Sequence, residues 1–484
     1  MDPLGQPAPD PSLFPSLVAR REFDNDLTLI LDAAAALVRG GRVAPDPGWQ
    51  DAENELAAFD FAAPEPLQDV TAWVIGQLSA GIVQITNPRY FGLFNPAPAF
   101  PAVVADRIAS LFNPQLASAT TSPAAVAIEA HTIRAVARRA GFSADRISGH
   151  FTNGGSEANY TALLAALTFG NHAYATHGAR AYSGAPRIYV SVDSHLAWIK
   201  IAHQAGIGRS AVRFIDTDGH GRLDPVHLAA TIEQDRRNGD IPVMLVATAG
   251  TTIAGEIDPL EACAEIAWHE RLWYHVDAAW GGAAIASDQL RRLLKGVELA
   301  DSATFDAHKW FATTMGCGMF ICARPEILNT VFGVEAAFMP PSQSKGADPY
   351  LSTVQWSRRF LGLRLFMALA TAGWAGYGHH VEKSVGLAAA LKDQLEARGW
   401  TVVNDPALAV VCAIPPAGSP SPRAIVQHVV SGGSVWVSSG RFENKDVIRA
   451  CVTHGESSPD DIRTLVDTLQ AALHQVLPGQ GARA

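Results

Sequence analysis

A lysine in apolar surroundings is the first candidate for chemistry in this chain. The stretch Thr304 to Phe311, TFDAHKWF, places Lys309 directly after a histidine and before two aromatic residues, in a chain in which 17% of the residues are charged. Lysine is among the residues least often buried without a partner. Either its ammonium reaches water along an apolar surface, or its amine takes part in a reaction. Desolvation favours the neutral amine, so Lys309 is a candidate nucleophile.

A second stretch suggests an anion site. His150 to Leu167, HFTNGGSEANYTALLAAL, predicts a short strand, a Gly-Gly turn and a helix that opens at Ser156. Two glycines let the backbone approach an anion closely, and the first N–H groups of a helix point at it. The pattern indicates a phosphate cradle, although it is neither a P-loop nor the GxGxxG fingerprint. An ordinary turn in which Ser156 caps the helix explains this stretch equally well.

A third stretch contributes a carboxylate. Leu272 to Gly282, LWYHVDAAWGG, ends an apolar run in Asp277. A carboxylate at the end of a buried strand is costly unless a cation or a hydrogen-bond donor meets it. The small residues Ala278 and Ala279 leave space for a flat group beside the chain. An Asx cap on the following turn is the simpler explanation of the aspartate.

Two more predicted strand ends complete the set. VDSHLAWIK puts His195 at the tip of one strand, and the hydroxyl-rich loop TAGTTIAGEIDP follows another. Each is a weak signal alone. Together, in chain order, they offer an anion site, a ring that can stack, a carboxylate and a lysine at successive strand ends. One ligand explains all of them, because pyridoxal phosphate has a phosphate, a flat ring, a pyridine nitrogen for Asp277 and an aldehyde for Lys309.

The elements that would position these residues alternate between strands and helices. Apolar, β-rich runs predict strands at 187–192, 242–248, 272–276, 302–305 and 318–322, and helical stretches such as PLEACAEIAWHER separate several of them. This alternation predicts an α/β domain whose largely parallel sheet is covered on both faces. Ligands bind such sheets at the carboxyl ends of the strands.

The chain as a whole is expected to have three regions. These are an N-terminal helical segment (1–90), a large cofactor-binding domain (91–370) and a smaller C-terminal α+β domain (371–484). A net charge of −10 without a basic cluster argues against nucleic acid as a partner. The five cysteines form no metal-ligand pattern, and neither a secretory signal nor a membrane span stands out. We therefore expect a cytoplasmic protein with a small-molecule substrate and no metal.

Three motifs carry a resemblance to a known family. TNGGSEAN, HVDAAWGG and DAHKW, in this order, resemble the motifs of the group II pyridoxal-phosphate-dependent amino-acid decarboxylases, relatives of the aromatic-amino-acid and glutamate decarboxylases. The resemblance runs from about Pro88 to Ile462. It implies the aspartate-aminotransferase-like fold type I with a mostly parallel seven-stranded sheet, and a homodimer with shared active sites. It also implies decarboxylation of an L-amino acid through aldimine and quinonoid intermediates, releasing carbon dioxide and an amine.

The resemblance assigns roles to individual residues. Lys309 would hold the cofactor as a Schiff base, Asp277 would keep the ring nitrogen protonated, and His195 would stack on the ring. The other cofactor-binding residues, around the phosphate and the ring, would be Gly154, Gly155, Ser156, Thr252, Ala279, Ser302 and His308.

One position departs from the family. Relatives carry a tyrosine in a mobile loop resembling FSVDAEYLP, whereas this chain reads FGVEAAFMP and has Phe338 there. Phenylalanine has no proton to give to the carbanion left by decarboxylation. In family members with this exchange, the carbanion can instead meet molecular oxygen, which gives an aldehyde, ammonia and peroxide. Amine formation, with another group or water as the proton donor, and oxidative deamination are both open at this point.

The substrate side is less well defined. Tyr90, Phe91 and Phe94 offer aromatic surface. Arg449 resembles an arginine that faces the substrate in related folds, although a salt bridge holding the small domain explains it equally well. Small residues at 117–121 stand where aromatic-amino-acid decarboxylases tend to carry bulky aromatic ones. The pocket is therefore expected to be wider or more polar, and the sequence does not identify the amino acid.

Overall fold

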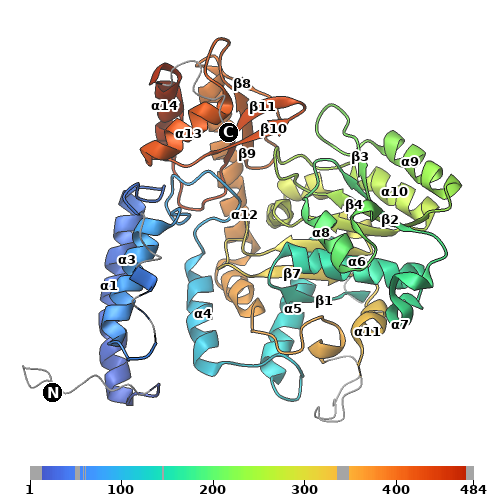
Figure 1. The fold of residues 1–484 in the computed structure, drawn as a ribbon, viewed down its shortest axis with the longest axis horizontal. Coiled ribbons are helices and arrows are strands. Elements are labelled where there is room, and N and C mark those ends of the chain that lie inside the picture. Colours follow the sequence, from blue (N-terminus) through green and yellow to red (C-terminus); the bar gives the residue numbers. More distant parts are fainter. Residues whose placement is uncertain are drawn as a thin grey trace, which may run out of the picture.

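The structure is a computed structural model that describes residues 13–49, 55–57, 59, 61–143, 146–334 and 348–475 of the 484-residue chain. Phe338, on which the choice between amine and aldehyde depends, lies outside these residues. A helical N-terminal part, a large α/β part and a smaller α+β part follow one another along the chain (Figure 1).

The large part is built on a seven-stranded sheet. Its strands are β1 (Ser148–Thr152), β2 (Pro186–Ser191), β3 (Val212–Ile215), β4 (Ile241–Thr248), β5 (Trp273–Asp277), β6 (Ser302–Asp306) and β7 (Gly318–Cys322), in the spatial order β1-β7-β6-β5-β4-β2-β3. The run from β6 to β3 is parallel throughout, while β7 is antiparallel to both β6 and β1. The mostly parallel seven-stranded sheet is therefore confirmed.

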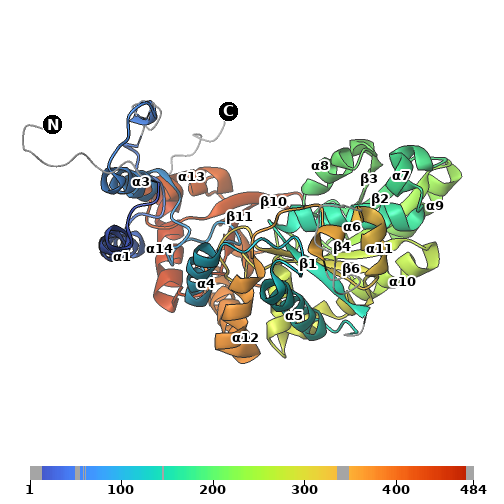
Figure 2. The ribbon, with the colours of Figure 1, turned by 90° about the horizontal axis from the view of Figure 1, so that it is seen from below.

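Helices cover both faces of this sheet (Figure 2). One face packs against α6 (Gly155–Gly170), α7 (Tyr174–His177), α8 (Ala197–Gln204) and α11 (Glu326–Phe332). The other packs against α5 (Pro123–Arg139), α9 (Pro225–Arg237), α10 (Leu260–Glu270) and the start of α12 (Gly362–Glu396). Burial on both faces explains why β4 reads as a continuous apolar run rather than an alternating one.

The smaller part has a four-stranded sheet in the order β10-β11-β9-β8. Its elements are β8 (Thr401–Val402), β9 (Val410–Ile414), α13 (Pro422–Gly432), β10 (Ser438–Phe442), β11 (Lys445–Cys451) and α14 (Pro459–Gln475). The long helix α12 connects it to the large part and is kinked at Gly373, three residues beyond the expected boundary at 370. The segment at the other expected boundary is tied to the small sheet, because Phe91 N–H donates to Trp436 O (2.8 Å) and Cys451 N–H donates to Phe91 O (2.9 Å).

The N-terminal helices stand apart from the large sheet. Figures 1 and 2 show α1 (Leu17–Gly40) and α3 (Leu67–Gly81) side by side, with α4 (Phe100–Phe112) between them and the sheet. Neither α1 nor α3 buries any of its residues. Among the residues that the structure describes, no helix combines the length and the apolar character that crossing a membrane requires.

Candidate active site

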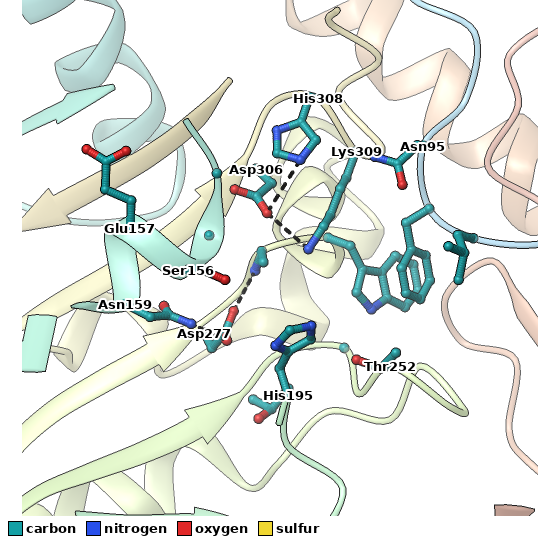
Figure 3. Close-up of a pocket in the computed structure, with 18 of the residues that line it drawn as sticks. Asn95, Ser156, Glu157, Asn159, His195, Thr252, Asp277, Asp306, His308 and Lys309 are labelled. Atoms are coloured by element: carbon teal, nitrogen blue, oxygen red, sulfur yellow. Dashed lines mark hydrogen bonds and ion pairs between the residues drawn. The ribbon is translucent and has the colours of Figure 1, made fainter. Parts of the chain in front are cut away.

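A cavity of about 500 Å³ lies where the carboxyl ends of β4, β5 and β6 meet the start of α6. This is the edge of a parallel sheet at which ligands are expected. Figure 3 shows side chains from these elements pointing into one common space, among them Lys309, Asp277 and His195. The predicted residues that line the cavity are Phe94, Gly154, Gly155, Ser156, His195, Thr252, Asp277, Ala279, His308 and Lys309.

Lys309 follows β6 and extends its amine into the cavity. Its Nζ lies 3.0 Å from Asp306 Oδ2, and its side chain is 21% exposed, whereas that of Asp306 is 2% exposed. Asp306 Oδ1 is buried without a hydrogen-bond partner. Asp306 was not among the predicted site residues, although it ends an apolar strand just as Asp277 does. In this structure Asp306 is the counterion of Lys309.

Asp277 is the last residue of β5 and is held in a fixed orientation. Its Oδ2 accepts a hydrogen bond from Asn159 Nδ2 (2.8 Å), and its Oδ1 accepts one from the backbone N–H of Ala279 (3.1 Å). The side chain is almost entirely buried, yet it borders the cavity. A carboxylate in this setting has a lone pair left for a cationic N–H group in the cavity.

A buried chain of hydrogen bonds lies behind Asp277. Because Asn159 turns its NH₂ group to the carboxylate, its Oδ1 must accept, and it lies 2.7 Å from Thr304 Oγ1 and 3.1 Å from His275 Nε2. His275 Nε2 therefore carries the proton, which leaves Nδ1 to accept from Ser302 Oγ at 2.8 Å. Burial lowers the pKa of His275 to about 4, so the ring is neutral, as this arrangement requires.

The position of Ser302 corrects one prediction. Ser302 was expected at the phosphate, but it is fully buried and does not line the cavity. Its hydroxyl accepts from Trp273 Nε1 (2.8 Å) and closes the chain that orients Asp277. The physical reason is strand direction: Ser302 begins β6, and in a parallel sheet the first residue of a strand lies at the edge opposite the ligand.

The Gly-Gly turn forms the rim of the cavity nearest to Asp306. The helix α6 begins at Gly155, not Ser156, and no side chain caps it, so the alternative in which Ser156 is the cap is wrong. A Cβ on Gly155 would lie 2.8 Å from Asp306 Oδ2, which explains the glycine. Ser156 is exposed to the cavity, where Figure 3 shows its hydroxyl. The first N–H groups of α6 thus face open space that suits a phosphate.

Two histidines border the same space. His195 follows β2, and its Nδ1 accepts a hydrogen bond from the backbone N–H of Ala197 (3.1 Å), which orients the exposed ring. His308 Nδ1 accepts from the backbone N–H of Cys317 (3.2 Å), and burial lowers the pKa of His308. His308 is therefore neutral at neutral pH and can offer an Nε2–H donor to a phosphate.

Three predicted substrate residues do not reach the cavity. Tyr90 and Phe91 are buried, and the hydroxyl of Tyr90 accepts a hydrogen bond from the backbone N–H of Leu93 (3.0 Å). Arg449 is also buried, and it donates to the carbonyls of Gly92 and Ile253. Arg449 lies against the ring of Phe94, with its guanidinium carbon 4.7 Å from the ring centroid. Leu93, Asn95 and Trp280, which were not predicted as site residues, do line the cavity.

These residues fit pyridoxal phosphate. A rim of glycine backbone and a helix start suits the phosphate, the oriented carboxylate of Asp277 suits a protonated ring nitrogen, and Lys309 supplies the primary amine. The small side chain of Ala279 and the ring of His195 leave space for a flat group between them. These features follow the ends of four strands, β1, β2, β5 and β6, and the fold brings them to one cavity.

Comparisons with known proteins agree with this assignment. Residues 53–413 match the model of the pyridoxal-dependent decarboxylase conserved domain. The acidic amino acid decarboxylase of Homo sapiens is 29% identical over 345 residues, which are 69% of this chain and 65% of that protein. This chain therefore aligns with slightly less than two thirds of that relative.

A bacterial relative and a solved structure match over more of the chain. The aromatic-L-amino-acid decarboxylase of Bacillus atrophaeus is 26% identical over 408 residues, 82% of this chain and 83% of that protein. Oryza sativa TDC, solved with PLP and tryptamine, has a TM-score of 0.90 at 23% identity and covers 96% of this chain and 99% of its own. At this identity the structural match shows the fold.

Proposed function

Because the chain belongs to the pyridoxal-dependent decarboxylase family, we propose that it removes the α-carboxylate of an L-amino acid with pyridoxal phosphate bound at Lys309, and releases carbon dioxide and an amine. The observation that carries the proposal is that Lys309, Asp277 and the Gly154–Ser156 turn line one cavity. The cofactor, when bound, supplies a ring that accepts the electron pair of the breaking Cα–carboxylate bond.

The residues around the cavity have separate tasks in this reaction. Lys309 Nζ would hold the cofactor through its aldehyde, and Asp306 Oδ2, 3.0 Å away, is placed to take the ammonium proton that Lys309 must lose before its amine can act as a nucleophile. Asp277 keeps a proton on the ring nitrogen, since a neighbouring carboxylate favours the charged form of that nitrogen. His195, which lines the cavity with its ring oriented by Ala197, would cover one face of a bound ring and keep water from that face.

A panel of L-amino acids incubated with the holoenzyme tests the proposal. Carbon dioxide, oxygen uptake and product mass are followed together. Carbon dioxide and an amine in equal amounts, without oxygen uptake, support the proposal. A requirement for a keto acid, with the carboxylate retained, would instead identify an aminotransferase.

Oxidative deamination is the second candidate, and Phe338 is the residue that favours it. A side chain without an exchangeable proton at the position of a general acid leaves the carbanion open to oxygen. The expected products are then an aldehyde, ammonia and hydrogen peroxide, with one oxygen molecule consumed for each carbon dioxide released. Oxygen uptake by the wild-type protein separates the two candidates.

Under the oxidative candidate, replacing Phe338 by tyrosine is expected to raise the ratio of amine to aldehyde on the order of 100-fold, because a general acid contributes about that much to a proton transfer. Product masses and oxygen uptake measure the ratio. Phe338→Leu is the matched control and should leave the ratio as it is. A wild-type protein that forms amine without consuming oxygen would remove the oxidative candidate.

We also propose that the protein acts as a homodimer assembled through its N-terminal helices. The exposed apolar side chains of these helices include Leu17, Leu29 and Leu37 on α1 and Leu111 and Phe112 on α4, each more than 70% exposed. Apolar surface of this extent on a single chain usually marks an interface. The active site would then be completed by the neighbouring subunit, as the family resemblance implies.

Replacing Leu29 and Leu37 by glutamate should convert the dimer to a monomer, because each charge would have to be buried in the interface. Light scattering coupled to size exclusion measures the mass. Asp32→Asn, a change at a polar position of α1, is the control and should leave the dimer intact. A wild-type protein that is monomeric at all concentrations would contradict the proposal.

A further inference from the structure

The side of the cavity next to Lys309 is an apolar wall. Leu93, Phe94 and Trp280 form it, and the Phe94 ring stacks on the indole of Trp280 with centroids 4.2 Å apart and planes 13° apart. Trp280 in turn contacts Trp310, 5.6 Å away between centroids. Three aromatic rings in contact make this wall stiff, since such rings pack in few arrangements.

A buried cation lies behind this wall. The guanidinium carbon of Arg449, on β11, is 4.7 Å from the centroid of the Phe94 ring, and Arg449 is 3% exposed. Its Nη1 donates to Gly92 O (2.7 Å) and to Ser438 Oγ (3.2 Å), and its Nε donates to Ile253 O (3.1 Å). These bonds attach the small sheet to the segment that carries Phe94.

The charge of Arg449 is not neutralised by an acid. No aspartate or glutamate of the described residues forms an ion pair with it, and its Nη2 is buried without a hydrogen-bond partner. A buried arginine normally pairs with a carboxylate, because an uncompensated charge in the interior is costly. Here the groups around it are carbonyl oxygens, a hydroxyl, the Cys451 thiol and the face of Phe94.

The charges on the cavity side of the wall disfavour an acidic substrate side chain. Of the described residues that line the cavity, Lys309 is the one with a permanent positive charge, and three are acidic: Glu157, Asp277 and Asp306. The amine of Lys309 already forms an ion pair with Asp306 and would bind the cofactor. A second carboxylate on the substrate would lose its hydration against an apolar wall, and among the described residues that line the cavity it would meet no cation other than Lys309.

We propose that Phe94 determines the substrate class: it selects amino acids with an apolar or aromatic side chain and keeps Arg449 from binding a substrate carboxylate. This inference rests on the decarboxylase function proposed above. The relatives include proteins named for acidic and for aromatic amino acids, so family membership leaves the class open. A smaller residue at position 94 would uncover the free Nη2 of Arg449 and turn the wall into an anion site.

Two acids without an amino group test this on the holoenzyme, because neither can condense with the cofactor. Hydrocinnamate has the carbon skeleton of phenylalanine, and glutarate has that of glutamate. Their dissociation constants are measured by calorimetry. Wild-type protein should bind hydrocinnamate about tenfold more tightly than glutarate, and Phe94→Ser should remove this preference by tightening glutarate about tenfold, the value of one charge-assisted hydrogen bond.

Matched variants show whether Arg449 is the cause. Phe94→Leu keeps an apolar side chain between Arg449 and the cavity. This variant should therefore keep the wild-type preference for hydrocinnamate over glutarate. In Phe94→Ser/Arg449→Met the gain for glutarate should disappear, and bound-cofactor absorbance confirms that each variant is folded. Glutarate binding to the wild type as tightly as hydrocinnamate, or a gain that survives in the double variant, would overturn the proposal.

The substrate panel separates failure of this inference from failure of the proposed function. Carbon dioxide release from glutamate or aspartate as fast as from phenylalanine or leucine would refute the role of Phe94 and leave the decarboxylase function standing. The predicted binding preference without carbon dioxide release from any amino acid would refute the function alone.

Discussion

Lys309→Ala is expected to abolish covalent attachment of pyridoxal phosphate and to lower the rate of decarboxylation on the order of 1,000-fold or more. Lys309 is the single primary amine among the described residues that line the cavity, so no other side chain there can bind the aldehyde. Borohydride reduction of the holoenzyme followed by peptide mass mapping measures the attachment. The wild type should carry the reduced cofactor on the peptide that contains Lys309.

Lys200→Ala is the matched control for this experiment. Lys200 is an exposed lysine of α8 that does not line the cavity, and its loss should leave both attachment and rate near those of the wild type. The reduced cofactor on any other lysine of the wild-type protein, or unchanged attachment in Lys309→Ala, would contradict the assignment of Lys309.

Asp277→Ala is the second change with a large expected effect. It should weaken cofactor binding about 10- to 100-fold, because a hydrogen bond between charged groups contributes roughly 1.5–3 kcal/mol. The decarboxylation rate should fall by at least as much, since the ring nitrogen loses the carboxylate that keeps it protonated. Absorbance titration gives the dissociation constant of the cofactor, and the rate is measured with the cofactor at saturation.

Two further variants divide the effect of Asp277 into its parts. Asp277→Asn keeps the volume and removes the charge, so its rate should be as low as that of Asp277→Ala. Ser302→Ala removes only the far end of the hydrogen-bond chain and should weaken cofactor binding less than either. An equal loss in Ser302→Ala would indicate that Ser302 contacts the phosphate after all.

The sequence predicted the large sheet well because most of its strands are buried on both faces. The five apolar runs expected in the middle of the chain appear as β2, β4, β5, β6 and β7, with ends shifted by at most one residue. The strand that it missed is β3, which has four residues at the edge of the sheet. Arg213 and Phe214 in this strand are partly exposed, so no continuous apolar run marks it.

The residues expected around the cofactor could also be picked out from the sequence. Lys309, Asp277 and the Gly-Gly turn each stand at the end of a predicted strand, and the carboxyl ends of parallel strands meet at one edge. The role of Ser302 came from resemblance alone and conflicted with that rule, because Ser302 begins its strand. Strand direction was the signal that could have excluded it.

The substrate side could not be predicted, because it depends on contacts between distant segments. Gly92 and Arg449 are 357 residues apart and meet through one hydrogen bond. Whether Arg449 reaches the cavity or lies behind Phe94 depends on how the small sheet packs against the 90–95 segment. No periodicity or local motif contains that information, and Tyr90 and Phe91 were misplaced for the same reason.

Decarboxylation at Lys309 can be tested by following the carboxylate carbon of the substrate. The holoenzyme is given the best amino acid of the panel with an isotope label in its carboxylate carbon, and the label is followed in the gas and in the product. We predict that the label leaves as carbon dioxide in step with product formation, and that Lys309→Ala releases almost none. Label retained in the product, or released by Lys309→Ala at the wild-type rate, would contradict decarboxylation at this site.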